Sequence, residues 1–253
     1  LAGPGMELGS LDDGAARKVK GVELVVPLPY GVGVLATTME AAEKARALLQ
    51  VSWSQGAKAA TYDSEGVLAD FAAIAEDAGQ VGVAVHKSGD AATLAAARPL
   101  SATYLTDHVC HATMEPMNAT AKVDADTADI WAPTQAPSLA QAAVAAALQM
   151  APDQVTVHTT LLGGGFGRRL DQDFIVDAVL LARAARKPVK ATWNRADDLR
   201  HDKLRPLTAQ HLSAGLDAAG AIVGWRHRLV SDSIAARVDP ADFRKTRRDG
   251  AVT

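Results

Sequence analysis

The stretch TTLLGGGFGRRLDQDF, residues 159–174, combines several features that could bind a ligand. Its glycines allow a bulky group to approach the backbone, and N–H groups at the start of a helix attract anions. Arg168 and Arg169 carry guanidinium groups suited to phosphate or carboxylate. Phe166 stands between glycines, which is unusual for a plain turn. The stretch is therefore either a ligand-binding loop or a tight turn in which Phe166 fills a core.

Two nucleotide-binding motifs do not fit this loop. A dinucleotide-binding G-x-G-x-x-G motif starting at Gly163 would require glycine where the chain has Arg168. A phosphate-binding G-x-x-x-x-G-K-[ST] motif requires Lys-Ser or Lys-Thr, and neither follows the glycines. The sequence therefore argues against a nucleotide-dependent oxidoreductase.

Other polar residues are weaker candidates for chemistry. His108, Cys110 and His111 are possible metal ligands, but strand alternation splits them between two faces and no second cluster follows. His201 and Asp202 are a possible acid–base pair, but neighbours in sequence point apart, so we expect a solvated loop there. Cys110 lacks the signature of a catalytic nucleophile. The sequence favours structural roles for these residues.

The composition excludes several classes of protein. The chain has 253 residues and a net charge of −3, which gives no general attraction to nucleic acid or anionic lipid. No apolar run approaches the roughly 18 residues that a membrane span needs. The single cysteine excludes an internal disulfide and an iron–sulfur cluster, which needs about four thiolates. Because the chain starts at Leu1 in a Gly- and Asp-rich loop, we expect a piece of a longer protein.

Periodicity predicts an α+β fold. Capping boxes at Thr37-x-x-Glu40 and Ser138-x-x-Gln141 indicate two helix starts. The predicted helices cover 39–49, 67–79, 139–150 and 171–187, and the predicted strands cover 22–36 (as a pair), 49–53, 101–123, 130–135, 154–162, 189–195 and 210–231 (as a pair). The order of elements changes near Ala97, so we expect a small α/β domain before it.

Three motifs together point to a known family. They are HATMEPMNATA (residues 111–121), IWAPTQAPSLAQ (130–141) and LLGGGFGRRL (161–170). In this order the chain resembles the molybdenum-cofactor-binding large subunit of the xanthine dehydrogenase/aldehyde oxidase family, in particular the branch of the isoquinoline 1-oxidoreductase beta subunits. WNRADDLRHDKLRP (193–206) and VSWSQGAKAATYDSEG (51–66) also resemble that branch, so the resemblance covers most of the chain.

The resemblance implies an architecture and a cofactor site. Residues 1–97 would form an incomplete small N-terminal domain, partly hammerhead-like, and 98–253 the first part of a mixed α+β molybdopterin-binding domain. Gln135 would hydrogen-bond an oxygen ligand of molybdenum, and the metal would take no protein side chain. The residues implied in cofactor binding are Gln135, Gly164, Gly165, Phe166, Gly167 and Arg168.

Two departures from the family pattern limit what is carried over. The xanthine-oxidising branch has Gly-Lys-Glu where this chain has Arg168, Arg169 and Leu170, which argues against purine substrates. The family's catalytic base is a glutamate in a Gly-x-Gly-Glu loop, expected downstream of Thr253, so no catalytic residue is assigned in this chain. Glu115 lies inside a shared motif and is structural by similarity.

The resemblance implies hydroxylation of N-heteroaromatics or aldehydes with oxygen from water. The cofactor would be a molybdenum-pterin group, either molybdopterin or its cytosine dinucleotide form. Iron–sulfur clusters would lie on a small partner subunit, and no nucleic acid or transmembrane segment is expected. The compartment, periplasm or cytoplasm, stays open. The alternative is a non-catalytic module whose Gly/Arg loop binds an anion or another subunit.

The absence of the base predicts that residues 1–253 alone are inactive. We expect no dye-linked oxidation of isoquinoline or benzaldehyde by the purified polypeptide, because no group in it would accept the proton from the attacking water. Turnover above the rate of a heat-denatured sample would contradict this expectation.

Overall fold

A computed structural model describes residues 1–2, 6–54, 61–90, 94, 98–238 and 240–246. These residues form two compact units. Unit 1 contains residues 1–62 and 110–203, and unit 2 contains 63–109 and 204–253. Residues 1–97 contribute to both units, so their assignment to one domain stays a prediction. The mixture of helices and strands confirms the predicted α+β class.

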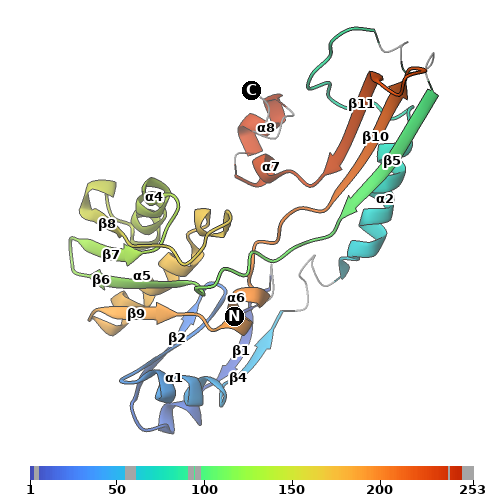
Figure 1. Cartoon of the computed structure of the whole chain (residues 1–253). Coiled ribbons are helices and arrows are strands. Elements are labelled where there is room, and N and C mark those ends of the chain that lie inside the picture. Colours follow the sequence, from blue (N-terminus) through green and yellow to red (C-terminus); the bar gives the residue numbers. More distant parts are fainter. Residues whose placement is uncertain (3–5, 55–60, 91–93, 95–97, 239, 247–253) are drawn as a thin grey trace. The chain divides into compact units, whose positions relative to one another are not determined.

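Unit 1 is built on a four-stranded sheet in the order β8-β7-β6-β9 (Figure 1). The strands are β6 (Asn118–Val123), β7 (Ala128–Ala132), β8 (Val155–Thr159) and β9 (Val189–Thr192). β7 and β8 are parallel, and the other pairs are antiparallel. Along β6 and β7 every second residue is buried, as expected for a sheet with one covered face.

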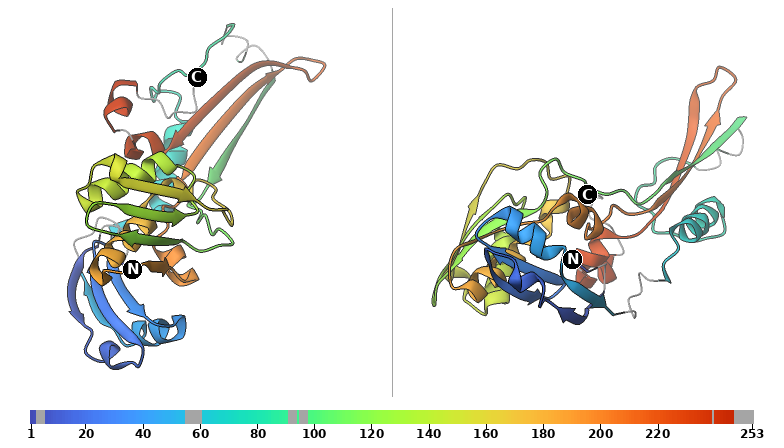
Figure 2. Two further views of the ribbon diagram at one scale, coloured as in Figure 1. Left: turned by 90° about the vertical axis from the view of Figure 1, so that its left-hand side faces the viewer. Right: turned by 90° about the horizontal axis from the view of Figure 1, so that it is seen from below.

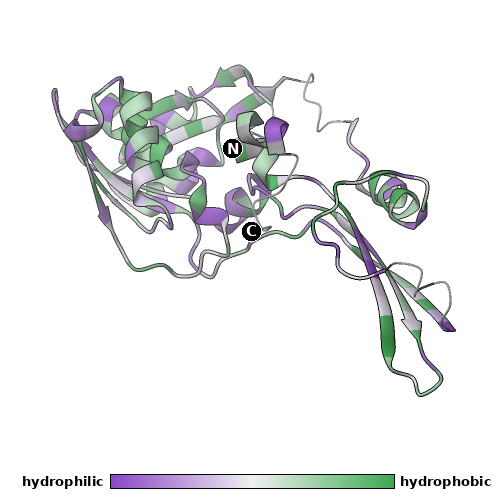
Figure 3. Cartoon of the chain, turned by 90° about the horizontal axis from the view of Figure 1, so that it is seen from above, coloured by the Kyte–Doolittle hydropathy of each residue, from purple (hydrophilic) through white to green (hydrophobic). Residues whose placement is uncertain are grey.

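Two helices cover the buried face of this sheet. α4 (Pro137–Leu148) connects β7 to β8, and α5 (Asp173–Ala185) follows the glycine-rich loop. Figure 3 colours both as largely hydrophobic. The predicted capping box at Ser138 is wrong: α4 begins with Pro137 in its first turn and has no side-chain cap. Pro is preorganised for that position, and Gln141 instead bonds the carbonyls of Pro152 and Val155.

Helix α5 is buried on two sides. Phe174 and Ala178 belong to the core shared with the sheet. On another side, Leu181 packs with Leu28 and Leu35 of a hairpin formed by β2 (Val22–Leu28) and β3 (Gly31–Ala36). A Cβ at Gly33 would lie 2.4 Å from Leu181 Cδ2, so a side chain there would displace the Leu181 side chain from this close approach. The helix therefore joins the hairpin to the sheet.

The other elements of unit 1 are short. β1 (Leu8–Asp12) pairs with β4 (Gln50–Trp53), and α1 (Met39–Arg46) follows the hairpin. Thr38, not the predicted Thr37, caps α1 through a bond from Ala41 N. After β9, Asn194 caps the helix α6 (Arg195–Arg200).

Unit 2 contains a three-stranded antiparallel sheet in the order β11-β10-β5 (Figure 2). Its strands are β5 (Arg98–Thr106), β10 (Thr208–Leu216) and β11 (Ile222–Ser231), and α2 (Ser64–Glu76) packs on them. Two short helices, α7 (Ile234–Val238) and α8 (Pro240–Thr246), follow. Among the described residues no helix has the length and hydropathy of a membrane span.

Asp177 gives a test of the core around α5. Its carboxyl is buried, Oδ2 accepts from Trp193 Nε1 at 3.2 Å, and Oδ1 has no hydrogen-bond partner among the described residues. Burial, together with the charge of Asp173, raises the pKa of Asp177 from 3.8 to about 7. The folded state therefore keeps a proton that the unfolded state releases, so stability falls as the pH rises from about 4 to 7.

We expect Asp177→Asn to remove this loss. The variant should be more stable than the wild type, and the difference should widen by about 2 kcal/mol between pH 5 and pH 7. Urea unfolding of both proteins at pH 5 and pH 7 measures this difference in unfolding free energy. Asp70→Asn, on an exposed position of α2, is the control and should show no such trend. A difference independent of pH would contradict the raised pKa.

Candidate functional site

The glycine-rich loop joins β8 to α5 and has an unusual backbone. Gly164 and Gly167 have φ values of 97° and 100°, which favour glycine. Phe166, between them, also has a positive φ of 54°. Because a bulky residue rarely adopts this conformation, the surrounding contacts must fix it.

Two other glycines permit close contacts with neighbouring segments. A Cβ at Gly163 would lie 2.3 Å from Glu115 Cβ, and one at Gly165 would lie 2.6 Å from Gln135 Oε1. A substitution at either position would force the neighbour to move. The glycines thus allow the loop to lie against the segments around Glu115 and Gln135.

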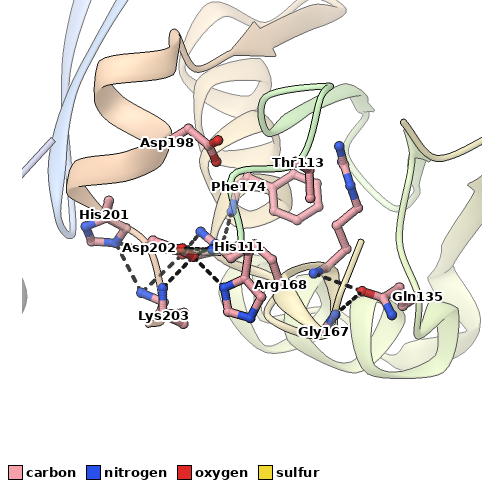
Figure 4. A network of polar contacts seen from close by, with 12 residues as sticks. His111, Thr113, Gln135, Gly167, Arg168, Phe174, Asp198, His201, Asp202 and Lys203 are labelled. Carbon is pink, nitrogen blue, oxygen red and sulfur yellow. Dashed lines mark hydrogen bonds and ion pairs between the residues drawn. The ribbon is translucent and has the colours of Figure 1, made fainter. Parts of the chain in front are cut away.

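Gln135 is bonded to the loop through its side-chain oxygen. Oε1 accepts hydrogen bonds from Gly167 N at 3.1 Å and Arg169 N at 3.3 Å (Figure 4). These two donors identify the amide oxygen, because an NH₂ group could not accept from them. The Nε2 group makes no hydrogen bond to the part of the chain that the structure describes. Gln135 therefore retains a fixed donor beside the loop.

Arg169 connects three segments from a buried position. Its Nε donates to Gly164 O at 2.8 Å, Nη1 to Pro133 O at 3.3 Å, and Nη2 to Glu115 O and Oε2, both at 2.8 Å. The side chain is fully buried. Its guanidinium group is therefore used within the protein.

Arg168 is equally enclosed. Nη1 and Nη2 donate to the two oxygens of Asp173 at 3.0 and 2.9 Å, and Nε lies 3.2 Å from Asp202 Oδ1. The guanidinium carbon lies 5.5 Å from the centre of the Trp193 ring. The hypothesis that Arg168 and Arg169 offer their guanidinium groups to an anion is wrong, because both side chains are buried and face protein carboxylates or carbonyls.

Glu115 has the structural role expected of it. Oε2 accepts from Gly163 N at 2.9 Å as well as from Arg169, and Oε1 accepts from Asn118 Nδ2 at 2.9 Å. Burial by itself would raise the pKa of Glu115, but the bonds from Asn118 and Gly163 and the charge of Arg169 together lower it. A carboxylate held in this way is a fixed anion and not a proton acceptor.

Phe166 does not fill a core. Its side chain is 67% exposed, and the nearby Met114 and Leu161 are 90% and 96% exposed. The alternative of a turn with Phe166 as a core plug is therefore wrong. The loop instead presents an apolar ring beside the amide of Gln135 and the glycine backbone.

His108, Cys110 and His111 are possible metal ligands by residue type, but the sequence favours structural roles for them. Among the described residues no three His, Cys, Asp or Glu side chains lie close enough to hold a metal ion. In unit 2, His108 bonds the carbonyl of Arg205, whereas in unit 1, His111 bonds Asp202. Burial raises the pKa of Cys110, which does not favour a thiolate nucleophile.

His201 and Asp202 do not form the expected solvated loop. Both are buried, with 5% and 6% of their surfaces exposed. His201 stacks on Tyr30 at 5.1 Å between ring centres, and Asp202 accepts from His111. Sequence reasoning missed them because their partners lie far away in the chain, and only the alternating charges of DDLRHDK hinted at an ion-pair network.

A family model for the molybdopterin cofactor-binding domain matches residues 74–244. The chain belongs to this family. The match includes all three motifs that meet at Arg169, and it confirms the resemblance inferred from them.

Curated relatives of this molybdopterin-binding chain are oxidoreductases by name. The beta subunit of the isoquinoline 1-oxidoreductase of Brevundimonas diminuta is 38% identical over 94% of this chain and 32% of its own length. A membrane-bound aldehyde dehydrogenase [pyrroloquinoline-quinone] of Gluconacetobacter polyoxogenes is 32% identical over 90% of this chain and 30% of its own length. The chain thus spans about a third of the length of these relatives.

Solved structures of similar fold come from the same class of enzymes. Quinoline 2-oxidoreductase of Pseudomonas putida 86 matches with a TM-score of 0.65 at 20% identity, over 90% of this chain and 34% of its own. The aldehyde oxidoreductase of Desulfovibrio gigas gives 0.67 at 18% identity, over 92% of this chain and 30% of its own. At this identity the likeness shows the fold alone.

The loop residues fit a molybdenum-pterin group in three respects. The glycine backbone at 163–165 and 167 is partly exposed, Gln135 presents an amide donor that no described residue accepts from, and Phe166 adds an exposed ring. Of the predicted cofactor residues, Arg168 is the exception, because its side chain faces protein carboxylates and the residue is buried. The roles of the others stay predictions.

The Glu115–Arg169 pair predicts a measurable loss of stability. Glu115→Gln should destabilise the folded chain by about 1–3 kcal/mol at pH 7, because a buried guanidinium loses its charged acceptor. The difference in unfolding free energy between wild type and Glu115→Gln should shrink at acidic pH, because the wild-type carboxylate is itself protonated below its lowered pKa.

Urea unfolding at pH 7 and pH 4 measures both effects. Glu43→Gln, which breaks the exposed ion pair with Arg46, is the control and should cost less than about 0.5 kcal/mol. Equal losses in the two variants would show that Glu115 is not needed to hold the buried Arg169.

Proposed function

We propose that this chain is part of the large subunit of a molybdenum hydroxylase, which oxidises N-heteroaromatics or aldehydes with water as the oxygen source. The observation that carries the proposal is the pairing of Gln135 with the glycine-rich loop. Two backbone N–H groups hold the amide oxygen, so the amide nitrogen is presented as a donor beside an exposed aromatic ring.

The chain's own residues would bind and orient the group. The backbone of Gly164, Gly165 and Gly167 would form one wall of the site, and Phe166 would shield that wall from water. Gln135 Nε2 would donate a hydrogen bond to an acceptor on the cofactor. When bound, the molybdenum-pterin group would supply two-electron redox chemistry, which no side chain provides.

Two observations support the proposed substrate class: the names of the relatives, and one residue of the loop that differs from the xanthine-oxidising branch. Relatives at 38% and 32% identity are named for isoquinoline and for aldehydes. Leu170 stands where the xanthine-oxidising branch has a glutamate, and it is 49% exposed. An apolar residue there offers no hydrogen bond to a purine, which supports apolar heteroaromatics or aldehydes.

Electrons would leave through a partner chain. The sole cysteine, Cys110, leaves this chain without the thiolates of an iron–sulfur cluster. Two relatives, an isoquinoline 1-oxidoreductase and a nicotinate dehydrogenase, are each named as one subunit of an enzyme, which supports an assembly of several chains. We therefore propose that the electron acceptor is a small iron–sulfur subunit.

The alternative of a non-catalytic anion-binding module has lost its main support. It depended on the guanidinium groups of Arg168 and Arg169, and both are enclosed by protein acceptors. A role of the exposed Phe166 in binding another chain remains compatible with the loop, and it would require no metal.

Metal and cofactor analysis of the full-length chain, purified in its native assembly, tests the proposal. We expect about one molybdenum and one pterin per chain, and dye-linked oxidation of isoquinoline or benzaldehyde in preference to xanthine. Pyrroloquinoline quinone without molybdenum, or no cofactor at all, would overturn the proposal.

The Gly165 contact predicts a specific loss of cofactor. Gly165→Ala would place a Cβ 2.6 Å from Gln135 Oε1 and displace the amide from its two donors. Loss of both bonds, about 2 kcal/mol, should weaken cofactor retention roughly 30-fold. Gly82→Ala, where an added Cβ meets nothing within 4 Å, is the matched control. Full molybdenum content in Gly165→Ala would show that the Gln135 contact is not needed.

A further inference from the structure

His111 is held firmly by Asp202 next to the glycine-rich loop (Figure 4). Its backbone N donates to Asp202 Oδ2 at 2.6 Å, and its ring nitrogen Nδ1 lies 2.9 Å from Oδ1. The two side chains are only 9% and 2% exposed. Two bonds to one carboxylate fix both the position and the plane of the imidazole ring.

The surroundings of Asp202 decide which ring nitrogen carries the proton. Oδ1 also accepts from Lys203 N at 2.8 Å and faces Arg168 Nε at 3.2 Å. A carboxylate surrounded by donors acts only as an acceptor, so Nδ1 of His111 must be the donor. In the neutral ring the proton therefore sits on Nδ1, and Nε2 is an acceptor with a free lone pair.

Nε2 faces the loop at Gly167. A Cβ built on Gly167 would lie 3.8 Å from His111 Nε2, so the nitrogen borders the loop surface at that residue. No described residue donates a hydrogen bond to it, although the ring is largely buried. An acceptor in such a position is normally satisfied by a ligand or an ordered water.

We propose that His111 Nε2 is a binding group of the cofactor site and accepts a hydrogen bond from an N–H donor of the pterin. Asp202 is the positioning residue, because it fixes the tautomer and the ring orientation. The inference rests on the proposed function of the loop. It places an acceptor on the opposite side of Gly167 from the bond to Gln135, so that the site offers the pterin both an acceptor and a donor.

Two substitutions separate the two ring nitrogens. His111→Asn retains an amide N–H near the position of Nδ1 and can still bond Asp202, but it has no atom at Nε2. His111→Gln extends an amide to about the position of Nε2 and can restore the acceptor there, while the bond to Asp202 is lost. His158→Asn is the control, because the exposed His158 pairs with Asp129 of the neighbouring strand β7.

The experiment measures how fast molybdenum and pterin are lost from the full-length chain in its native assembly during dialysis in dilute urea. We expect His111→Asn to lose both about five-fold faster than the wild type, the effect of one hydrogen bond. His111→Gln should approach the wild-type rate, and His158→Asn should match it.

Thermal unfolding of the cofactor-free assemblies is the second measurement. If His111 serves the fold alone, His111→Gln loses the Asp202 bond and is both the least stable and the fastest to release cofactor. Our proposal predicts that the two variants rank in opposite order in the two measurements. His111→Asn should be the more stable of the two in thermal unfolding, but it should retain the cofactor less well than His111→Gln. Equal retention in His111→Asn and wild type, or faster loss from His111→Gln, overturns the proposal. Absence of molybdenum from the wild type contradicts the proposed function instead.

Discussion

The structure around the candidate site depends on one buried guanidinium group. Arg169 donates to backbone carbonyls of Gly164 and Pro133 and to both the carbonyl and the carboxylate of Glu115. These three residues belong to three different motifs of the sequence, so one side chain brings the motifs together. This explains why the motifs carry information as a set: if any one of them were changed, the buried cation of Arg169 would lose one of its acceptors.

A second layer of charges fixes the ends of the loop. Arg168 is bonded by Asp173 at the start of α5 and approached by Asp202 after α6. Buried ion pairs contribute little net stability, since desolvation offsets much of the attraction, but they disfavour other arrangements. The strained backbone at Phe166 persists because these contacts leave the loop few alternatives. The charges around the loop therefore act as structural supports for an uncharged loop surface.

The sequence predicted local structure well and distant pairing poorly. The hairpin of β2 and β3, the strand before the glycines and α5 followed from periodicity, because their signals lie within a few residues. The exclusion of nucleotide motifs and the structural role of Glu115 were also accessible. The burial of Arg168 and Arg169 could not be predicted, because a pair of arginines has the same sequence pattern whether it faces solvent or carboxylates many residues away in the chain. The same holds for unit 2, where β5 pairs with β10 across most of unit 1 in the sequence.

The double burial of α5 has a consequence for synthesis on the ribosome. Leu28 and Leu35 of the hairpin are made early, whereas Leu181, against which they pack, is made much later. At typical translation rates the hairpin waits on the order of ten seconds with its apolar side uncovered. During that time it is a target for chaperones or for aggregation, and variants that slow the formation of α5 should lower the yield of soluble protein even where the finished fold is unaffected.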